Sequence, residues 1–72
     1  MEKQHEVYLH GNKITVVASK PISAQRWTII VHILKPDGTY LPKINDMDNS
    51  YSSLDEAFTS GVQAGTKVIE NK

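Results

Sequence analysis

Three histidines and a short run of carboxylates are the residues of this sequence whose types could do chemistry. His5, His10 and His32 could bind zinc, which needs three or four ligands that converge on one point. In the strand register derived below, the side chain of His5 points to the opposite sheet face from those of His10 and His32. We therefore expect no metal site. His32 lies inside an apolar patch, where a histidine could make an interface sensitive to pH.

The segment from Asp46 to Ser50 is spaced like the beginning of a calcium-binding loop. Such a loop also needs glycine at its sixth position and glutamate at its twelfth, and this sequence has Tyr51 and Ala57 there. Asp46 and Asp48 could instead form a catalytic carboxylate pair, but no partnering base accompanies them. We expect no cofactor and no enzymatic activity.

Length and charge narrow the class of protein. The chain has 72 residues, no cysteine, and eight basic residues against eight acidic ones. This length allows one domain, residues 1–72. Interspersed charges with a net sum of zero disfavour nucleic acid as the direct ligand, since nucleic-acid binders usually carry a basic stripe. The polar N-terminus is unlike a signal peptide and no apolar run reaches membrane-spanning length, so we expect a cytoplasmic protein without membrane association.

Two alternating segments predict a β-hairpin over residues 5–19. The Gly-Asn dipeptide at residues 11–12 is a two-residue turn signal, because glycine readily adopts the positive φ that such a turn needs. With this turn, Leu9 faces Ile14 across the hairpin. The apolar residues of both strands then share one face, as a half-buried hairpin requires.

The most apolar segment, RWTIIVHILK, predicts the third strand and begins a second hairpin over residues 25–44. The next residues, KPDGT, fit a type I turn that is closed by a glycine with positive φ. A loop of this kind pairs Leu34 with Tyr40.

The fourth strand is predicted at residues 39–44. Pro42 cannot donate a ladder hydrogen bond, so this strand is expected at an edge of the sheet. The polar segment NDMDNSYS that follows is predicted to be the loop into the helix.

The stretch SLDEAFTSGVQAGTKVIE predicts a helix over residues 54–70, because Ser53 begins a capping box and apolar residues recur at helical spacing. Gly61 and Gly65 lie on the apolar stripe, although each costs about 1 kcal/mol against alanine in a helix interior. Three interpretations stay open here. The helix approaches the sheet closely across a bulky group such as Trp27, it breaks at Gly65, or it contains a hinge.

Together these elements predict an α+β fold of the ββββα type, a four-stranded antiparallel meander sheet with one C-terminal helix packed on one face. The core is expected to take the apolar residues of one sheet face, namely Val7, Leu9, Ile14, Val16, Trp27, Ile29, Val31, Ile33 and Leu41. The other face would carry Tyr8, Val17, Ile30, His32, Leu34 and Tyr40, with Ile44 as a further candidate. This face is too apolar for contact with water alone, unless the register is wrong by one residue or the N-terminus covers it.

Taken as a whole, the chain resembles a group of small uncharacterised bacterial proteins. The shared features are Arg26-Trp27 near a strand start, Asp37-Gly38 in a turn, Asp55-Glu56-Ala57 at the helix start, and Gly65 before Ile69. This resemblance covers residues 8–69 and implies a sheet-plus-helix fold with no known activity. The segment from Ser53 to Ala57 is also similar, more weakly, to antitoxins of the HicB type. This chain lacks their Pro-Gly-Cys-like turn and their DNA-binding segment.

We expect a small non-enzymatic protein-interaction module that binds a partner protein, or itself as a homodimer, through the helix-free sheet face. The predicted site residues are Tyr8, Ile30, His32, Leu34 and Tyr40. Ile30, Leu34 and Tyr40 are the anchors, because large buried side chains carry most interface energy. The alternatives are an antitoxin-like regulator and a nucleic-acid-binding sheet domain, in which the tyrosines would stack on bases beside Lys13 and Arg26.

Overall fold

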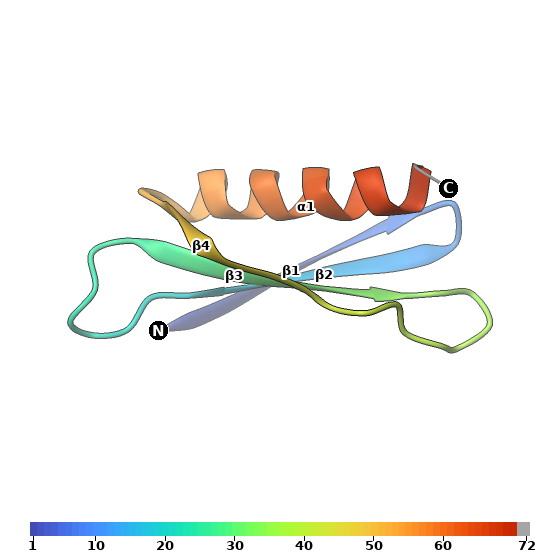
Figure 1. Cartoon of the computed structure of the whole chain (residues 1–72), viewed down its shortest axis with the longest axis horizontal. Helices are drawn as coiled ribbons and strands as arrows, with labels where there is room; N and C mark the ends of the chain where they lie inside the picture. The colour runs from blue at the N-terminus through green and yellow to red at the C-terminus, as the bar shows by residue number, and fades with distance from the viewer. Residues whose placement is uncertain (71–72) are drawn as a thin grey trace.

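The computed structural model describes residues 1–70, apart from the side chains of Met47 and Asp48. Its elements, in chain order, are β1 (Glu2–Leu9), β2 (Asn12–Ser19), β3 (Trp27–Leu34), β4 (Ile44–Tyr51) and α1 (Leu54–Glu70). The strands form one antiparallel sheet in the order β1-β2-β3-β4. Figure 1 shows α1 lying along one face of this twisted sheet, with no described helix or strand on the other. The predicted α+β fold is confirmed. The calcium and catalytic hypotheses for Asp48 concern a side chain outside the described part.

The β1–β2 hairpin turns one residue earlier than predicted. His10 and Gly11 occupy the turn with φ of 51° and 79°, as a type I′ turn requires at both central positions. Leu9 therefore pairs with Asn12 and not with Ile14. The Asn12 side chain also donates to the carbonyls of Leu9 and His10, at 3.2 and 3.3 Å. The register moves by two residues, so each side chain keeps its predicted face.

The fourth strand runs through residues that were predicted to be a loop. The prediction of a strand at residues 39–44 is wrong, since β4 begins at Ile44 and ends at Tyr51. The second hairpin therefore extends beyond the predicted 25–44. Tyr40 does bridge Leu34, as predicted, but only as an isolated pair. Asparagine and aspartate have low strand propensity, so pairing with β3 and not local preference makes this segment a strand.

This polar strand is irregular beside the start of β3. Trp27 and Ile29, which are two residues apart on β3, pair with Tyr51 and Asp46, which are five residues apart on β4. Arg26 closes the resulting bulge, because its Nε donates to Ser50 Oγ at 2.6 Å and its Nη2 donates to the Ser50 carbonyl at 3.0 Å. The predicted loop thus survives in part, as a bulge inside the strand.

The core lies between α1 and the sheet. Its buried side chains come from alternate positions of β2 and β3 and from α1: Ile14, Val16, Ala18, Trp27, Ile29, Val31, Ile33, Ala57 and Ile69. The predicted core residues Val7, Leu9 and Leu41 are only half-buried. Ile44 was a candidate for the helix-free face. It pairs instead with Val31 and packs against the core, because β4 begins there.

The helix α1 continues through both of its glycines. A methyl group added to Gly61 would lie 2.5 Å from Val16 Cγ1, and one added to Gly65 would lie 2.8 Å from Ile14 Cγ2. The close-approach interpretation is therefore confirmed, and the helix does not break at Gly65. The group beneath the glycines was predicted wrongly, since it is Val16 and Ile14 of β2 and not Trp27.

Candidate interaction surface

The register places all five predicted site residues on the sheet face opposite α1, which we call the open face. Its side chains from the sheet are Glu2, Gln4, Glu6, Tyr8, Lys13, Thr15, Val17, Ser19, Thr28, Ile30, His32, Leu34 and Asn45, and Tyr40 joins them through its bridge to Leu34. The predicted residues Tyr8, Ile30, His32, Leu34 and Tyr40 are all among them. Their role in binding stays a prediction.

Antiparallel pairing arranges the middle of the open face in rows that cross the strands. One row holds Tyr8, Lys13, Leu34 and Tyr40, the next holds Glu6, Thr15 and His32, and a third holds Gln4, Val17, Ile30 and Asn45. A polar row with His32 therefore separates Leu34 from Ile30. The apolar patch expected from the sequence is thus interrupted, and the face is mixed.

Side chains of the open face differ in exposure between the two inner strands, β2 and β3, and the positions on either side of them. Val17, Ile30 and Leu34 are half-buried, although no described helix or strand covers them. Tyr8 and Tyr40, by contrast, are 70% and 65% exposed. Half-buried aliphatic groups beside exposed aromatic ones resemble the composition of protein–protein interfaces, in which aromatic residues are enriched.

The charged groups of the open face were not anticipated as a pair. Lys13 Nζ lies 3.8 Å from Glu6 Oε2 across the β1–β2 hairpin. An ion pair as exposed as this one contributes little to stability. The pair shows that Lys13 has a carboxylate as its near neighbour. The correct turn register could have revealed this proximity, because it places Tyr8 opposite Lys13 and Glu6 two residues before Tyr8.

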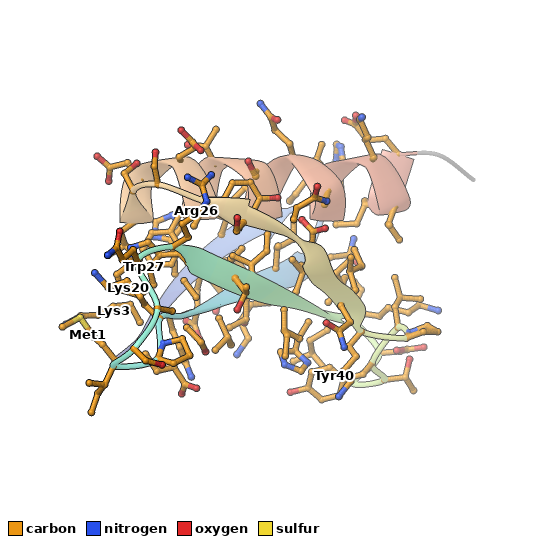
Figure 2. The ribbon with its side chains drawn as sticks, turned by 60° about the vertical axis from the view of Figure 1, so that its left-hand side comes forward. Met1, Lys3, Lys20, Arg26, Trp27 and Tyr40 are labelled. Carbon is orange, nitrogen blue, oxygen red and sulfur yellow. The ribbon has the colours of Figure 1, made fainter. Side chains whose placement is uncertain are left out.

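The cations that the nucleic-acid alternative requires are not brought together. Arg26 binds Ser50 at the start of β3, whereas Tyr40 follows the end of that strand. Figure 2 shows Arg26 at the same end as Lys20 and Trp27, away from Tyr40. The ammonium group of Lys20 lies 5.3 Å from the centre of the Trp27 ring. The structure therefore separates Arg26 from the exposed tyrosines.

The histidines lie in three different surroundings. His5 stacks on Phe58 of α1 with ring centres 5.1 Å apart, His10 is in the β1–β2 turn, and His32 is on the open face. Within the described residues, no three histidine, aspartate or glutamate side chains are grouped so that they could hold a metal ion.

The carboxylate of Asp46 accepts hydrogen bonds from two residues of its own strand. Its Oδ2 accepts a hydrogen bond from the Tyr51 hydroxyl, and its Oδ1 accepts one from Asn49 Nδ2 at 2.6 Å. The bond to Asp46 raises the pKa of Tyr51 above its ordinary value, because the phenolate could no longer donate to the carboxylate. All three residues belong to β4, so these bonds organise its bulge.

Among residues 1–70 no helix is both long enough and apolar enough to cross a membrane. No model of a known protein family matches the chain, and no curated protein or solved structure is significantly similar to it. The resemblances to small bacterial proteins and to HicB-type antitoxins therefore stay predictions.

Proposed function

We propose that the protein is a small non-enzymatic interaction module of the cytoplasm that binds a protein through its open face. The observation that carries this proposal is the pair Val17 and Ile30. These residues lie opposite each other at the centre of the open face, half-buried and without a described element over them. Apolar side chains that gather on a surface are typical of binding sites, because a partner removes them from water.

Ile30, Leu34 and Tyr40 are the anchors that we assign to this site. Tyr40 is mostly exposed and offers a large ring that a partner can bury. His32 lies between the row that contains Leu34 and the row that contains Ile30, where it would need a hydrogen-bonding group on the partner. The anchors Ile30, Leu34 and Tyr40 would then supply affinity, and His32 would supply specificity.

The charges of this surface favour a protein over a nucleic acid as the partner. Lys13 is the single lysine or arginine among the described side chains of the open face, and Glu2 and Glu6 share that face. Phosphate groups are repelled by carboxylates, and each phosphate contact normally needs a cation.

A second copy of the chain is one partner that this surface suits. A two-fold dimer presents the same patch on both subunits, so the patch must match itself. The open face carries a lysine and glutamates as well as apolar rows, and it can therefore pair opposite charges across a symmetric contact. The proposal thus includes a homodimer.

Replacement of Ile30 by aspartate tests the proposal, with Thr28→Asp as the matched control. Thr28 lies on the same strand and face, two residues nearer to the end opposite the tyrosines. Sedimentation equilibrium across micromolar concentrations measures self-association, and affinity capture from host lysate measures partners. We expect Ile30→Asp to lose the dimer or the captured partner, and Thr28→Asp to keep it.

Tyr40→Ser provides a second variant, because loss of an exposed ring is compatible with folding. Circular dichroism verifies the fold of each variant. The proposal is wrong if folded Ile30→Asp and Tyr40→Ser both associate as the unmodified protein does.

A further inference from the structure

Strand β1 is an edge of the sheet, and half of its main-chain groups point away from β2. Met1 and Lys20 exchange both main-chain hydrogen bonds, at 2.9 and 2.8 Å. Opposed residues of an antiparallel pair alternate between those that exchange both bonds and those that exchange none. The odd-numbered residues of β1 therefore bond to β2. The even-numbered ones, Glu2, Gln4, Glu6 and Tyr8, turn their N–H and C=O groups outward.

This edge is more regular than the opposite one. The eight residues of β1 pair with β2 without a bulge and contain no proline. At the other edge, β4 contains the bulge that Arg26 closes. Bulges and prolines are two of the devices that prevent an edge strand from pairing with another chain, and β1 has neither; the device that it does carry is the charged side chains of Glu2, Lys3 and Glu6.

A shallow groove lies between β1 and α1, beside this edge. Its apolar lining comes from Val7, Phe58 and Val62, and the ring of His5 is stacked on Phe58. Asp55, at the start of α1, is the only aspartate, glutamate, lysine or arginine of the lining. The groove therefore offers an apolar surface with one carboxylate at its helix-start end.

We propose that β1 and this groove bind an extended peptide segment of a partner protein, which adds to the sheet as a further strand. The outward N–H and C=O groups match an extended backbone and no other conformation. In an added strand every second side chain points toward the helix side, so a large apolar side chain would enter the groove. A lysine or arginine two residues away would lie near Asp55.

A second copy of β1 fits the groove less well than such a peptide. The helix-side residues of β1 are Lys3, His5, Val7 and Leu9. If Val7 or Leu9 of a second copy entered the groove, Lys3 would lie at least four residues away and not at the position that faces Asp55. This site uses main-chain groups of β1 and a groove on the helix side of the sheet, whereas the open face presents side chains on the opposite side, so the present proposal does not rest on the proposed function.

Selection from a displayed library of random seven-residue peptides, followed by synthesis of the enriched peptides, tests this site. We expect the enriched peptides to alternate apolar residues with others and to contain a basic residue. Nuclear magnetic resonance on the full chain should then show slower amide exchange at Gln4, Glu6 and Tyr8 when a peptide is bound. The amides of His5 and Val7, already bonded to β2, should exchange slowly with or without peptide.

The variant Gln4→Pro removes one outward N–H group and leaves every bond to β2 in place. Loss of that hydrogen bond should weaken peptide binding by about tenfold. Gln4→Thr is the matched control, because it changes the side chain and keeps the N–H group, and we expect it to bind as the unmodified protein does.

Three results would overturn the proposal. The library yields no peptide that binds above background, the peptides bind Gln4→Pro as tightly as Gln4→Thr, or sedimentation shows a dimer that Gln4→Pro dissociates and Gln4→Thr does not. The last result would assign the β1 edge to a second copy of the chain.

Discussion

Strands β2 and β3 present one face that is almost entirely apolar and one face that is mixed, and only the apolar face is covered. On β3 the covered face carries Trp27, Ile29, Val31 and Ile33, none more than 7% exposed, whereas the open face carries Thr28, Ile30, His32 and Leu34, all half-buried. The close fit of α1 to the apolar face depends on its two glycines. Gly61 and Gly65 let the helix backbone approach the branched side chains of Val16 and Ile14. The pattern of apolar residues thus defines the core face, and the two glycines fit the helix closely to it.

Neighbouring isoleucines on β3 give the largest expected contrast between the faces. Ile29→Ala should lower the free energy of unfolding by about 2–5 kcal/mol, because it leaves a cavity in a closed core. Ile30→Ala should lower it by about 1 kcal/mol, because water reaches that position already. Urea unfolding of both variants measures the difference. Equal losses would mean that the open face is as well packed as the covered one.

Gly61→Ala tests how closely α1 fits this face. Helix propensity alone predicts that alanine stabilises by about 1 kcal/mol. The contact with Val16, whose side chain is stiff, predicts a net loss of about 1–3 kcal/mol by overpacking. Lys67→Ala, on the exposed side of α1, should change stability by less than about 0.5 kcal/mol. A gain in thermal stability for Gly61→Ala would contradict the close approach.

Tyr51→Phe tests the polar edge of the covered face. Loss of the hydrogen bond to Asp46 should lower stability by about 1 kcal/mol. The raised pKa of Tyr51 means that the folded state favours the neutral phenol. The contribution of the Tyr51–Asp46 hydrogen bond to the free energy of unfolding is therefore complete below about pH 10. It is lost as pH rises through the folded-state pKa of Tyr51. Unfolding measured from pH 8 to 11 should show this loss in the unmodified protein and not in Tyr51→Phe.

Asp37 lies in the β3–β4 loop, outside both faces, and should give the smallest effect. Its carboxylate accepts hydrogen bonds from the Thr39 hydroxyl at 2.7 Å and the Thr39 amide at 3.0 Å. These bonds lower the pKa of Asp37 below its ordinary value, so the loop is stabilised above that value and loses this support as pH falls through the lowered pKa. A resonance titration should detect the lowered pKa of Asp37 and a smaller lowering in Thr39→Val, which loses the hydroxyl and keeps the amide, with no change in the signals of core residues.

The sequence was sufficient to predict which residues lie on the open face, but it did not predict how they are arranged there. Side-chain alternation places Tyr8, Ile30 and Leu34 on one face whichever of the two turn registers forms, since the registers differ by two residues. The rows depend on the register itself. The turn at His10, with its positive φ, brings Lys13 opposite Tyr8, and the β2–β3 register places His32 opposite Thr15. The resulting polar row of Glu6, Thr15 and His32 interrupts the apolar patch.

The sequence by itself determined the helix at residues 54–70, the alternation along β1 to β3, and which of their side chains share a face, because these follow from the local periods of helix and strand. Only the tertiary structure decided the course of β4. Its polar residues have little intrinsic preference for a strand, and hydrogen bonds to the edge of β3 stabilise them in one. It also decided which residues lie beneath Gly61 and Gly65, because that depends on how the helix crosses the sheet and not on any spacing along the chain.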